Sequence, residues 1–409
     1  MNAPPSPTSP PDVVVLGGGA AGFFAAIAAA EGGARVRLLE RGARVLTKVL
    51  ISGGGRCNVT NAEEKPEKLV RNYPRGGAEL RGPFTKFGPR DTRRWFESRG
   101  VALKTEEDGR VFPVTDRSQT IVDALTEAAH RANVEVRTGA AVRAMRPDGT
   151  GFQLDLNSGE SLSAARVLLA TGSNPQGHAW ARALGHTIVP PVPSLFTFTI
   201  KDPRLKGLAG VASPRARVKL EGTSLEQAGP VLITHWGLSG PAVLRLSAWG
   251  ARVMHEGGYR GTLRVNWLDQ SPEVLQKTFD QKRKTDPRKS LSASPFDIPQ
   301  RLWDSLRTAA GLPAERRWAD LSKPEMARLG AELGDGAYAV TGKSAFKDEF
   351  VTSGGVALEE VDFRTMESRR CPGLYFAGEI LDIDGVTGGF NFQNAWTTGW
   401  LAGRALARR

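Results

Sequence analysis

Short apolar runs alternate with helix-forming stretches at the start of the chain. Residues 13–16 (VVVL) are wholly apolar, as expected of a strand buried on both faces of a parallel sheet. The small-residue stretch 20–30 predicts a helix, and residues 35–39 (RVRLL) predict a second strand. Strand, helix and strand in this order indicate a βαβ unit of a parallel α/β fold.

The same pattern divides the rest of the chain into blocks. A proline-rich stretch near residue 192 precedes short alternating runs, which predict a mainly antiparallel β domain. A helical, strongly charged block follows, and a strand–loop–helix pattern of the first kind then returns. The predicted divisions are a disordered tail (1–11), a discontinuous first domain (12–192 and 352–409), an inserted β domain (193–270 and 335–351) and a basic helical subdomain (271–334).

Three glycines after the first strand, Gly17, Gly19 and Gly22, have the G-x-G-x-x-G spacing. In that motif the glycines permit a tight turn, the approach of a pyrophosphate and close packing of the helix on the strand. Glu40 ends the second strand, where it can accept a hydrogen bond from a ribose hydroxyl. The alternative is a glycine-rich turn in another α/β protein. The predicted dinucleotide contacts are Gly17, Gly19, Ala20, Ala21, Gly22, Glu40 and Arg41.

A second glycine-rich stretch begins near Ser52, where three glycines in a row precede Arg56. Backbone amides of such a turn can converge on an anion, and the arginine adds positive charge. A flexible turn is the alternative. The predicted contacts here are Lys48, Ser52, Gly53, Gly54, Gly55, Arg56, Cys57 and Asn58.

Two further apolar strands, 167–172 (VLLATG) and 374–379 (LYFAGE), each end in a small-small-Gly turn. Such turns bring backbone close to a ligand at the carboxyl ends of parallel strands. A glycine-rich loop then leads into a helix from about Asn391, whose positive end would stabilise a reduced flavin ring. Two such strand ends and a glycine-rich helix start, in this order after the G-x-G-x-x-G motif, favour a flavin over NAD alone. The predicted contacts are Ala170, Thr171, Gly172, Gly378, Glu379, Asp384, Gly388, Gly389, Phe390 and Asn391, with fixing of the loop as the alternative role of Asp384.

Composition narrows the class of protein. The chain is 40% hydrophobic and 24% charged, and no apolar run approaches the roughly 18–20 residues of a membrane helix. The two cysteines, Cys57 and Cys371, provide no disulfide framework and no zinc spacing, so a cytoplasmic location is expected. The net charge of +12 favours anionic partners such as nucleic acid, and a solvated arginine-rich surface is the alternative.

Several longer motifs carry a family resemblance. They are LISGGGRCNVTN (50–61), GRVFP (109–113), ITHWGLSGP (233–241), SGGV (353–356), TMES (365–368) and the stretch 373–403, which begins GLYFAGEILDIDGVTGGFNFQ. Over about residues 12–405 the chain resembles the bacterial aminoacetone-oxidase-like, or BaiN-type, NAD(P)/FAD-dependent oxidoreductases, a group that includes ribosomal RNA dihydrouridine synthases.

The resemblance implies a fold and a cofactor. The fold would be α/β, with a discontinuous Rossmann FAD-binding domain of the glutathione-reductase type, an inserted antiparallel β-barrel and a small helical subdomain. No second G-x-G-x-x-G has strand and helix context, so we expect NAD(P)H to dock transiently at the flavin, with another reductant or oxygen as alternatives. By matching positions FAD would be lined by Gly17, Gly19, Gly22, Glu40, Arg56, Cys57, Asn58, Gly378, Glu379, Gly388, Gly389 and Asn391.

Reduction of an enone-like C=C bond needs a hydride from the flavin and a proton donor. Cys57 is one candidate donor, because a thiol with a pKa of about 8.5 can supply a proton. His235, in the inserted domain, is the other. The alternatives are a small packing residue and a structural histidine, respectively.

The helical insert carries a run of cations between Trp267 and Trp303, namely Lys277, Lys282, Arg283, Lys284, Arg288 and Lys289. Cations beside exposed aromatics suit RNA, and a solvated helix face is the alternative. The favoured hypothesis is NAD(P)H-driven reduction of uridine in 23S rRNA to dihydrouridine, with rRNA as partner and no stable protein partner evident. The alternatives are an oxygen-using amine oxidase of the aminoacetone type and a non-catalytic flavin-carrying RNA-binding protein.

Overall fold

The computed structural model describes residues 12–344 and 351–408 of the 409-residue chain. The predicted tail, residues 1–11, lies outside the described residues. Two compact units are formed: unit 1 contains the residues up to Val192 and from Val351 onward, and unit 2 contains those between them. Unit 2 is therefore an insertion in unit 1, and each unit is described by itself.

Unit 1 is organised around a seven-stranded sheet in the order β19-β20-β21-β10-β1-β2-β6. The five strands from β21 to β6 are parallel to their neighbours, whereas β20 pairs antiparallel with both β19 and β21. Strand β1, the middle one of the five parallel strands, is fully buried, which explains its unbroken apolar sequence. The bounds are β1 (Val13–Leu16), β2 (Val36–Leu39), β6 (Glu135–Arg137), β10 (Arg166–Leu169), β19 (Val361–Asp362), β20 (Glu367–Ser368) and β21 (Leu374–Phe376).

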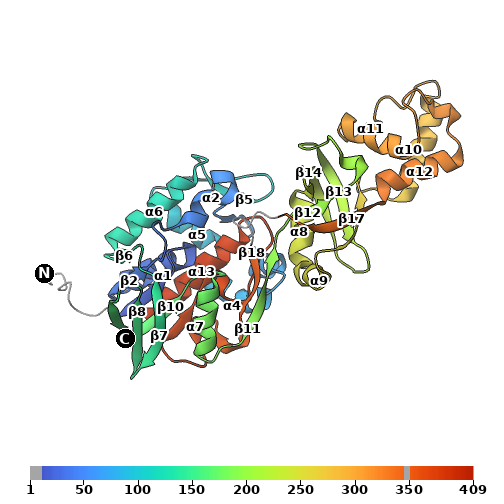
Figure 1. Ribbon diagram of the computed structural model, residues 1–409. Helices are drawn as coiled ribbons and strands as arrows, with labels where there is room; N and C mark the ends of the chain where they lie inside the picture. Colours follow the sequence, from blue (N-terminus) through green and yellow to red (C-terminus); the bar gives the residue numbers. More distant parts are fainter. Residues whose placement is uncertain (1–11, 345–350, 409) are drawn as a thin grey trace. The chain divides into compact units, whose positions relative to one another are not determined.

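Two helices from opposite ends of the sequence, α1 (Ala20–Glu31) and α13 (Phe390–Leu406), pack against each other in this unit (Figure 1). Their backbones lie so close that a Cβ on Gly399 would come within 2.7 Å of the Ala21 carbonyl oxygen, and one on Gly403 would overlap that of Ala25. The other helices of unit 1 are α2 (Thr47–Gly55), α3 (Pro66–Leu69), α4 (Gly77–Lys86), α5 (Pro89–Glu97), α6 (Ser118–Arg131) and α7 (Pro175–Ala183).

Three small sheets complete unit 1. One has the order β3-β5-β4, one is the antiparallel meander β7-β8-β9, and β11 pairs with β18 where the chain passes to and from unit 2. The bounds are β3 (Thr60–Asn61), β4 (Leu103–Thr105), β5 (Arg110–Pro113), β7 (Val142–Asp148), β8 (Gly151–Leu156), β9 (Ser161–Ala164), β11 (Ile188–Ser194) and β18 (Val351–Val356).

Unit 2 contains a closed barrel in the order β12-β15-β14-β13-β16-β17, and its recorded strand pairs are antiparallel. Along β13 buried and exposed residues alternate from Ala216 to Leu220, which is the two-residue period of a strand with one face exposed to solvent. The predicted barrel is confirmed. Its strands are β12 (Phe198–Ile200), β13 (Ala212–Leu220), β14 (Glu226–Ile233), β15 (Gly237–Ser239), β16 (Gly261–Asn266) and β17 (Gly336–Lys343), accompanied by α8 (Pro241–Trp249) and α9 (Ala251–Glu256).

The helical part of unit 2 consists of α10 (Pro272–Thr285), α11 (Gln300–Ala309) and α12 (Lys323–Gly334). Trp267 and Trp303 are fully buried here, with their indole N–H groups donating to the Tyr338 hydroxyl at 3.0 Å and the Leu291 carbonyl at 2.8 Å. The prediction that these two rings stand exposed beside the cations is therefore wrong. They are core residues whose polar atoms are satisfied inside the protein.

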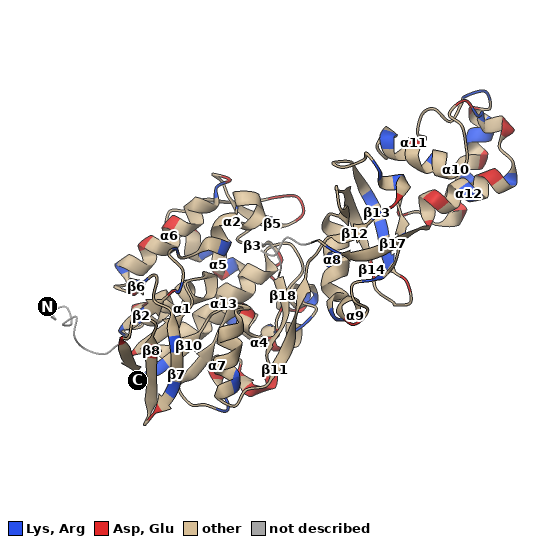
Figure 2. Ribbon diagram, viewed as in Figure 1, with Lys and Arg blue, Asp and Glu red and all other residues tan. Residues whose placement is uncertain are grey.

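Lys and Arg are spread over both units among Asp and Glu (Figure 2). No helix in the described part of the chain combines the length and the apolar character needed to cross a bilayer. Within residues 12–344 and 351–408, no three His, Cys, Asp or Glu side chains are grouped so as to hold a metal ion.

Candidate functional site

The loop between β1 and α1 shows why its three glycines differ. A Cβ on Gly17 would overlap the carbonyl oxygen of Ala170, and one on Gly22 would overlap the carbonyl oxygen of Gly17. A Cβ on Gly19, by contrast, would meet nothing within 4 Å. The first and third glycines are thus required by the protein's own packing, whereas the second faces open space of the kind a pyrophosphate needs.

The end of β2 holds a fixed carboxylate. Glu40 accepts the N–H of Gly18 at 2.8 Å on one oxygen and the N–H of Gly42 at 2.7 Å on the other. These bonds orient the side chain beside the glycine loop. Each carboxylate oxygen has a second lone pair, so a ribose hydroxyl could still donate to it. Arg41 is exposed next to this group.

The ends of β10 and β21 meet at the same edge of the sheet. Gly172 and Gly378 both have left-handed backbone conformations, with φ of +58° and +77°. A Cβ on Gly172 would lie 3.6 Å from an oxygen of Glu379. Glu379 also accepts the N–H of Thr352 at 2.8 Å and pairs with Lys48 at 3.0 Å. The structure therefore joins Lys48, on α2, to a carboxylate more than 300 residues later in the chain.

The beginning of α13 rests on the strand β3. Gly389, the residue before the helix, has φ of +90°, and a Cβ there would overlap the Thr60 carbonyl oxygen. Asn61 donates to the Gly388 carbonyl at 3.0 Å. With its amide oriented to satisfy both of its ends, Asn58 accepts the Gly389 N–H at 2.9 Å. Asn391 exchanges two hydrogen bonds of 2.8 Å with the backbone of Gly385 and so fixes the preceding loop.

Gln393 is a site residue that reasoning from the sequence missed. Its side chain is fully buried near the beginning of α13. Its amide oxygen accepts the hydroxyls of Thr60 at 2.6 Å and Thr92 at 2.9 Å, and its amide nitrogen donates to Thr397 at 2.9 Å. This hub ties α13 to β3 and α5. The available signal was a polar residue within a largely apolar helix.

The glycine triplet forms a left-handed turn at the end of α2, with φ of +57°, +67° and +83° at Gly53, Gly54 and Gly55. Arg56 follows, but its guanidinium is taken up by acids: it lies 2.5 Å from Glu106 and 2.6 Å from Asp116. It also covers the ring of Phe112 at 4.1 Å. These contacts orient Arg56 toward the protein's own carboxylates.

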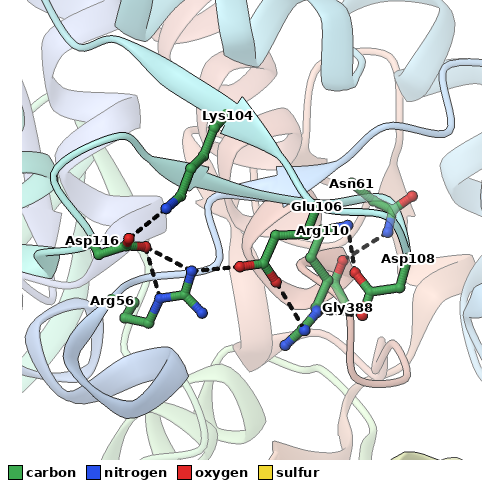
Figure 3. Close-up of polar contacts among 8 residues, drawn as sticks. All are labelled: Arg56, Asn61, Lys104, Glu106, Asp108, Arg110, Asp116 and Gly388. Atoms are coloured by element: carbon green, nitrogen blue, oxygen red, sulfur yellow. Dashed lines mark hydrogen bonds and ion pairs between the residues drawn. The ribbon is translucent and has the colours of Figure 1, made fainter.

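The Arg56 contacts belong to a longer network on the β3-β5-β4 sheet (Figure 3). Asp116 also pairs with Lys104, and Glu106 pairs with Arg110 at 2.9 Å. Arg110 in turn reaches Asp108 at 2.7 Å. The hydrogen bonds from Lys104 and Arg56 lower the pKa of Asp116. Cations and acids alternate, so the network is internally compensated.

The two predicted proton donors lie in different surroundings. Cys57 is fully buried with φ of +57°, and burial raises the pKa of its thiol to about 12. It is a protonated, enclosed thiol near neutral pH, which favours the packing interpretation. His235 is exposed on the turn between β14 and β15. That turn is held by the Thr234 hydroxyl, which accepts the N–H groups of Trp236 and Gly237 at 3.2 Å each.

Asp384 is fully buried and forms an ion pair with Arg75, with which it also shares an isolated antiparallel bridge. This geometry favours the fixing of the loop over contact with a cofactor. In the loop after β10, Thr171 Oγ1 is buried with no hydrogen-bond partner among the described residues, and the same holds for His178 Nε2 on α7. Burial lowers the pKa of His178, so its imidazole is neutral at physiological pH.

The residues at this edge of unit 1 fit FAD. Open space at Gly19, a fixed carboxylate at Glu40 and the positive end of α1 suit its adenosine and diphosphate half. The turns at Gly172 and Gly378 and the beginning of α13 suit its flavin half. Adjacent parallel strands bring all these groups to the carboxyl edge of one sheet.

Comparison with known proteins agrees with this picture. The family model described as "HI0933-like protein Rossmann domain" matches residues 11–405. The chain is 33% identical to the ribosomal RNA dihydrouridine synthase of Escherichia coli (strain K12), over 92% of this chain and 93% of that protein. It is 32% identical to the 3-dehydro-bile acid delta(4,6)-reductase of Clostridium scindens, over 93% of this chain and 94% of that protein.

Among solved structures, a 3-ketosteroid-delta4-(5alpha)-dehydrogenase from Rhodococcus jostii RHA1 has a TM-score of 0.51 at 16% identity, covering 98% of this chain and 97% of that one. A flavocytochrome c3 fumarate reductase has a TM-score of 0.50 at 19% identity, covering 98% of this chain and 78% of that one. At these identities the likeness concerns the fold. The predicted Rossmann-type FAD-binding fold with an inserted antiparallel barrel is confirmed.

Proposed function

The chain belongs to the HI0933-like Rossmann-domain family and is an FAD-dependent oxidoreductase, and on this premise we propose that it reduces a carbon–carbon double bond with electrons from NAD(P)H. Uridine in 23S rRNA is the leading substrate. The observation that carries this proposal is the match over more than nine-tenths of the chain to relatives named as a dihydrouridine synthase and a delta(4,6)-reductase. Both names describe the saturation of a C=C bond.

The carboxyl edge of the unit 1 sheet, with Gly19, Glu40, Gly172, Gly378 and the beginning of α13, is called the FAD edge below. Its residues have separate roles in this proposal. Gly19 would leave room for the diphosphate, and Glu40 would accept a hydrogen bond from a ribose hydroxyl. The pair of Glu379 and Lys48 would hold the ribityl chain. The α13 N-terminus, held by Gln393, would supply positive charge to the bound flavin ring. When bound, the flavin supplies the hydride.

The proposed proton donor is His235, because its side chain is exposed whereas the thiol of Cys57 is enclosed. A His235→Gln variant should lose turnover with little change in FAD content, and Cys57→Ala should keep most of its turnover. Anaerobic reduction by NADPH followed by mixing with substrate separates the reductive step from proton delivery. Equal turnover of His235→Gln and the unaltered protein would remove His235 from the mechanism.

The substrate is tested by deleting the gene and measuring dihydrouridine in 23S rRNA by mass spectrometry. We expect the modification to disappear and to return with a plasmid copy of the gene, but not with one that carries Gly19→Asp. Unchanged dihydrouridine in the deletion strain would exclude this substrate. Rapid reoxidation of the flavin by air, with release of peroxide on addition of aminoacetone, would support the amine-oxidase alternative.

A further inference from the structure

We propose that a cationic corner of unit 2, formed by Arg283, Lys284, Arg288 and Arg317, binds the sugar–phosphate backbone of RNA. The inference rests on the proposed rRNA substrate and names the surface that would engage it. The first three residues lie at the end of α10 and in the loop after it. Arg317 is distant in the sequence, and only the fold brings it to them.

The backbone holds this corner together. Residues 287–291 run against residues 316–319, with an isolated antiparallel bridge between Ser290 and Arg317. The N–H groups of Trp318 and Ala319 donate to the carbonyls of Lys289 and Pro287, both at 3.1 Å. Trp318 is buried beneath this pairing. The loop is thus fixed in place, and binding of a polyanion would not have to order it.

The acid in the loop does not pair with the four cations of the corner. The acid in the loop, Asp286, lies 2.8 Å from both Lys282 and Lys289, and these two lysines lower its pKa to about 2. Asp286 is therefore ionised and already paired at neutral pH. Within the described residues, none of the four corner cations has a recorded ion pair with a carboxylate.

The barrel offers a contrast in the same unit. Arg217 pairs with Glu226 and Asp269, at 2.8 and 2.6 Å, and Arg264 pairs with Asp335. These two barrel arginines thus have acids for partners. A phosphate backbone binds more tightly to cations that have no carboxylate partner, because each contact then releases a counterion without breaking an ion pair inside the protein.

The buried tryptophans decide the mode of binding. Trp267 and Trp303 cannot stack on bases, since both are fully buried. Contact at the corner is therefore electrostatic, independent of base sequence and strongly dependent on salt. The corner would provide affinity and positioning, and would leave the choice of nucleotide to the site of reduction.

The test uses the full-length holoenzyme with Arg283, Lys284, Arg288 and Arg317 all changed to Gln. The control carries Lys65, Lys68, Lys86 and Arg90 changed to Gln, which are exposed in unit 1 and remove the same charge. Binding of a fluorescently labelled 23S rRNA fragment is measured from 50 to 200 mM KCl. Four lost phosphate contacts should make the slope of log K against log salt shallower by about 3 and weaken binding on the order of 100-fold at the lowest salt.

The control should keep the slope, and the flavin absorbance and melting temperature of both variants should match those of the unaltered protein. An unchanged slope in the corner variant, or an equal loss in the control, would overturn the proposal. The proposal would also be overturned if the corner variant lost binding to phosphatidylserine vesicles, or to an acidic protein, while its RNA binding stayed intact. Dihydrouridine in the 23S rRNA of the deletion strain is measured separately. If RNA binding depends on the corner but dihydrouridine is unchanged in the deletion strain, the proposed substrate is refuted and the proposal for the corner stands.

Discussion

The FAD edge of unit 1 and the cationic corner of unit 2 use polar groups in opposite ways. At the FAD edge polar side chains are largely bound by the protein itself: Gln393 is enclosed by three threonines, and Arg56 by two acids. At the corner, cations that pair with no acid among the described residues stand on a surface fixed by backbone hydrogen bonds. The first arrangement defines a shape, and the second supplies a charge.

The two regions show that a cation's place in a sequence motif does not determine what it contacts. Arg56 lies directly after a glycine triplet, where a phosphate contact is the natural expectation, yet its contacts are carboxylates. Arg317 lies in no motif and joins the corner through one bridge. The partners of a cation, and not its neighbours in sequence, decide whether it is available to a ligand.

The largest expected effect tests the shape of the FAD edge. A Gly19→Asp variant places a carboxylate in the open space meant for the diphosphate, so FAD affinity should fall at least about 100-fold, or about 2.7 kcal/mol. The protein should purify colourless, as measured from the flavin absorbance per chain. Gly82→Asp is the matched control, because a Cβ there also meets nothing within 4 Å. Full FAD occupancy in Gly19→Asp would refute the assignment of the site.

The next effect tests whether the buried hub is structural. Gln393→Met keeps the approximate shape but leaves the buried hydroxyls of Thr60 and Thr92 without their acceptor, at a cost of about 2–3 kcal/mol in the free energy of unfolding. Urea denaturation of the holoenzyme measures this cost, and FAD affinity should weaken with it. Gln119→Met, on α6 and exposed, should change stability by less than about 0.5 kcal/mol. Equal stability of the two variants would contradict the role of the hub.

A smaller effect is expected from the enclosed thiol at high pH. Because the folded pKa of Cys57 is about 12 and its ordinary value is 9.0, its contribution to stability is complete below pH 9 and is lost as pH rises toward 12. Between pH 8 and 10 the protein should lose about 1.4 kcal/mol more than a Cys57→Ala variant. Denaturation at the two pH values measures this difference. Parallel pH profiles would show that the thiol is not enclosed.

The smallest effect has the opposite sign and tests the corner. Asp286→Asn removes the acid that holds Lys282 and Lys289, so the corner becomes more positive and rRNA binding should tighten about threefold at 50 mM KCl. The same substitution in unit 1, Asp123→Asn on α6, should leave binding unchanged. Weaker binding by Asp286→Asn would mean that Asp286 positions the loop more than it offsets its charge.

Much of this architecture follows from short-range sequence pattern. The first βαβ unit and the alternating strands of the barrel depend on local periodicity, and the structure confirms them as parts of the fold. The hub at Gln393, the acids around Arg56 and the burial of Trp303 depend on residues far away in the chain. No local pattern specifies such partners. The outline of the fold was therefore predictable from the sequence, whereas the side-chain hydrogen bonds and ion pairs of the site were not.

The pairing of β11 with β18 has a consequence for how such a protein changes over time. The chain leaves unit 1 along one of these strands and returns along the other, with Gly354 packed on the backbone of Pro190 and Pro191. Unit 2 is therefore a cassette on a two-stranded stem. Removal of unit 2 would need one join between these neighbouring strands, and its exchange would need two; in both cases the glycine loop and α13 would stay intact. A lineage built on this stem could therefore vary unit 2 while the residues that fit FAD stay unchanged.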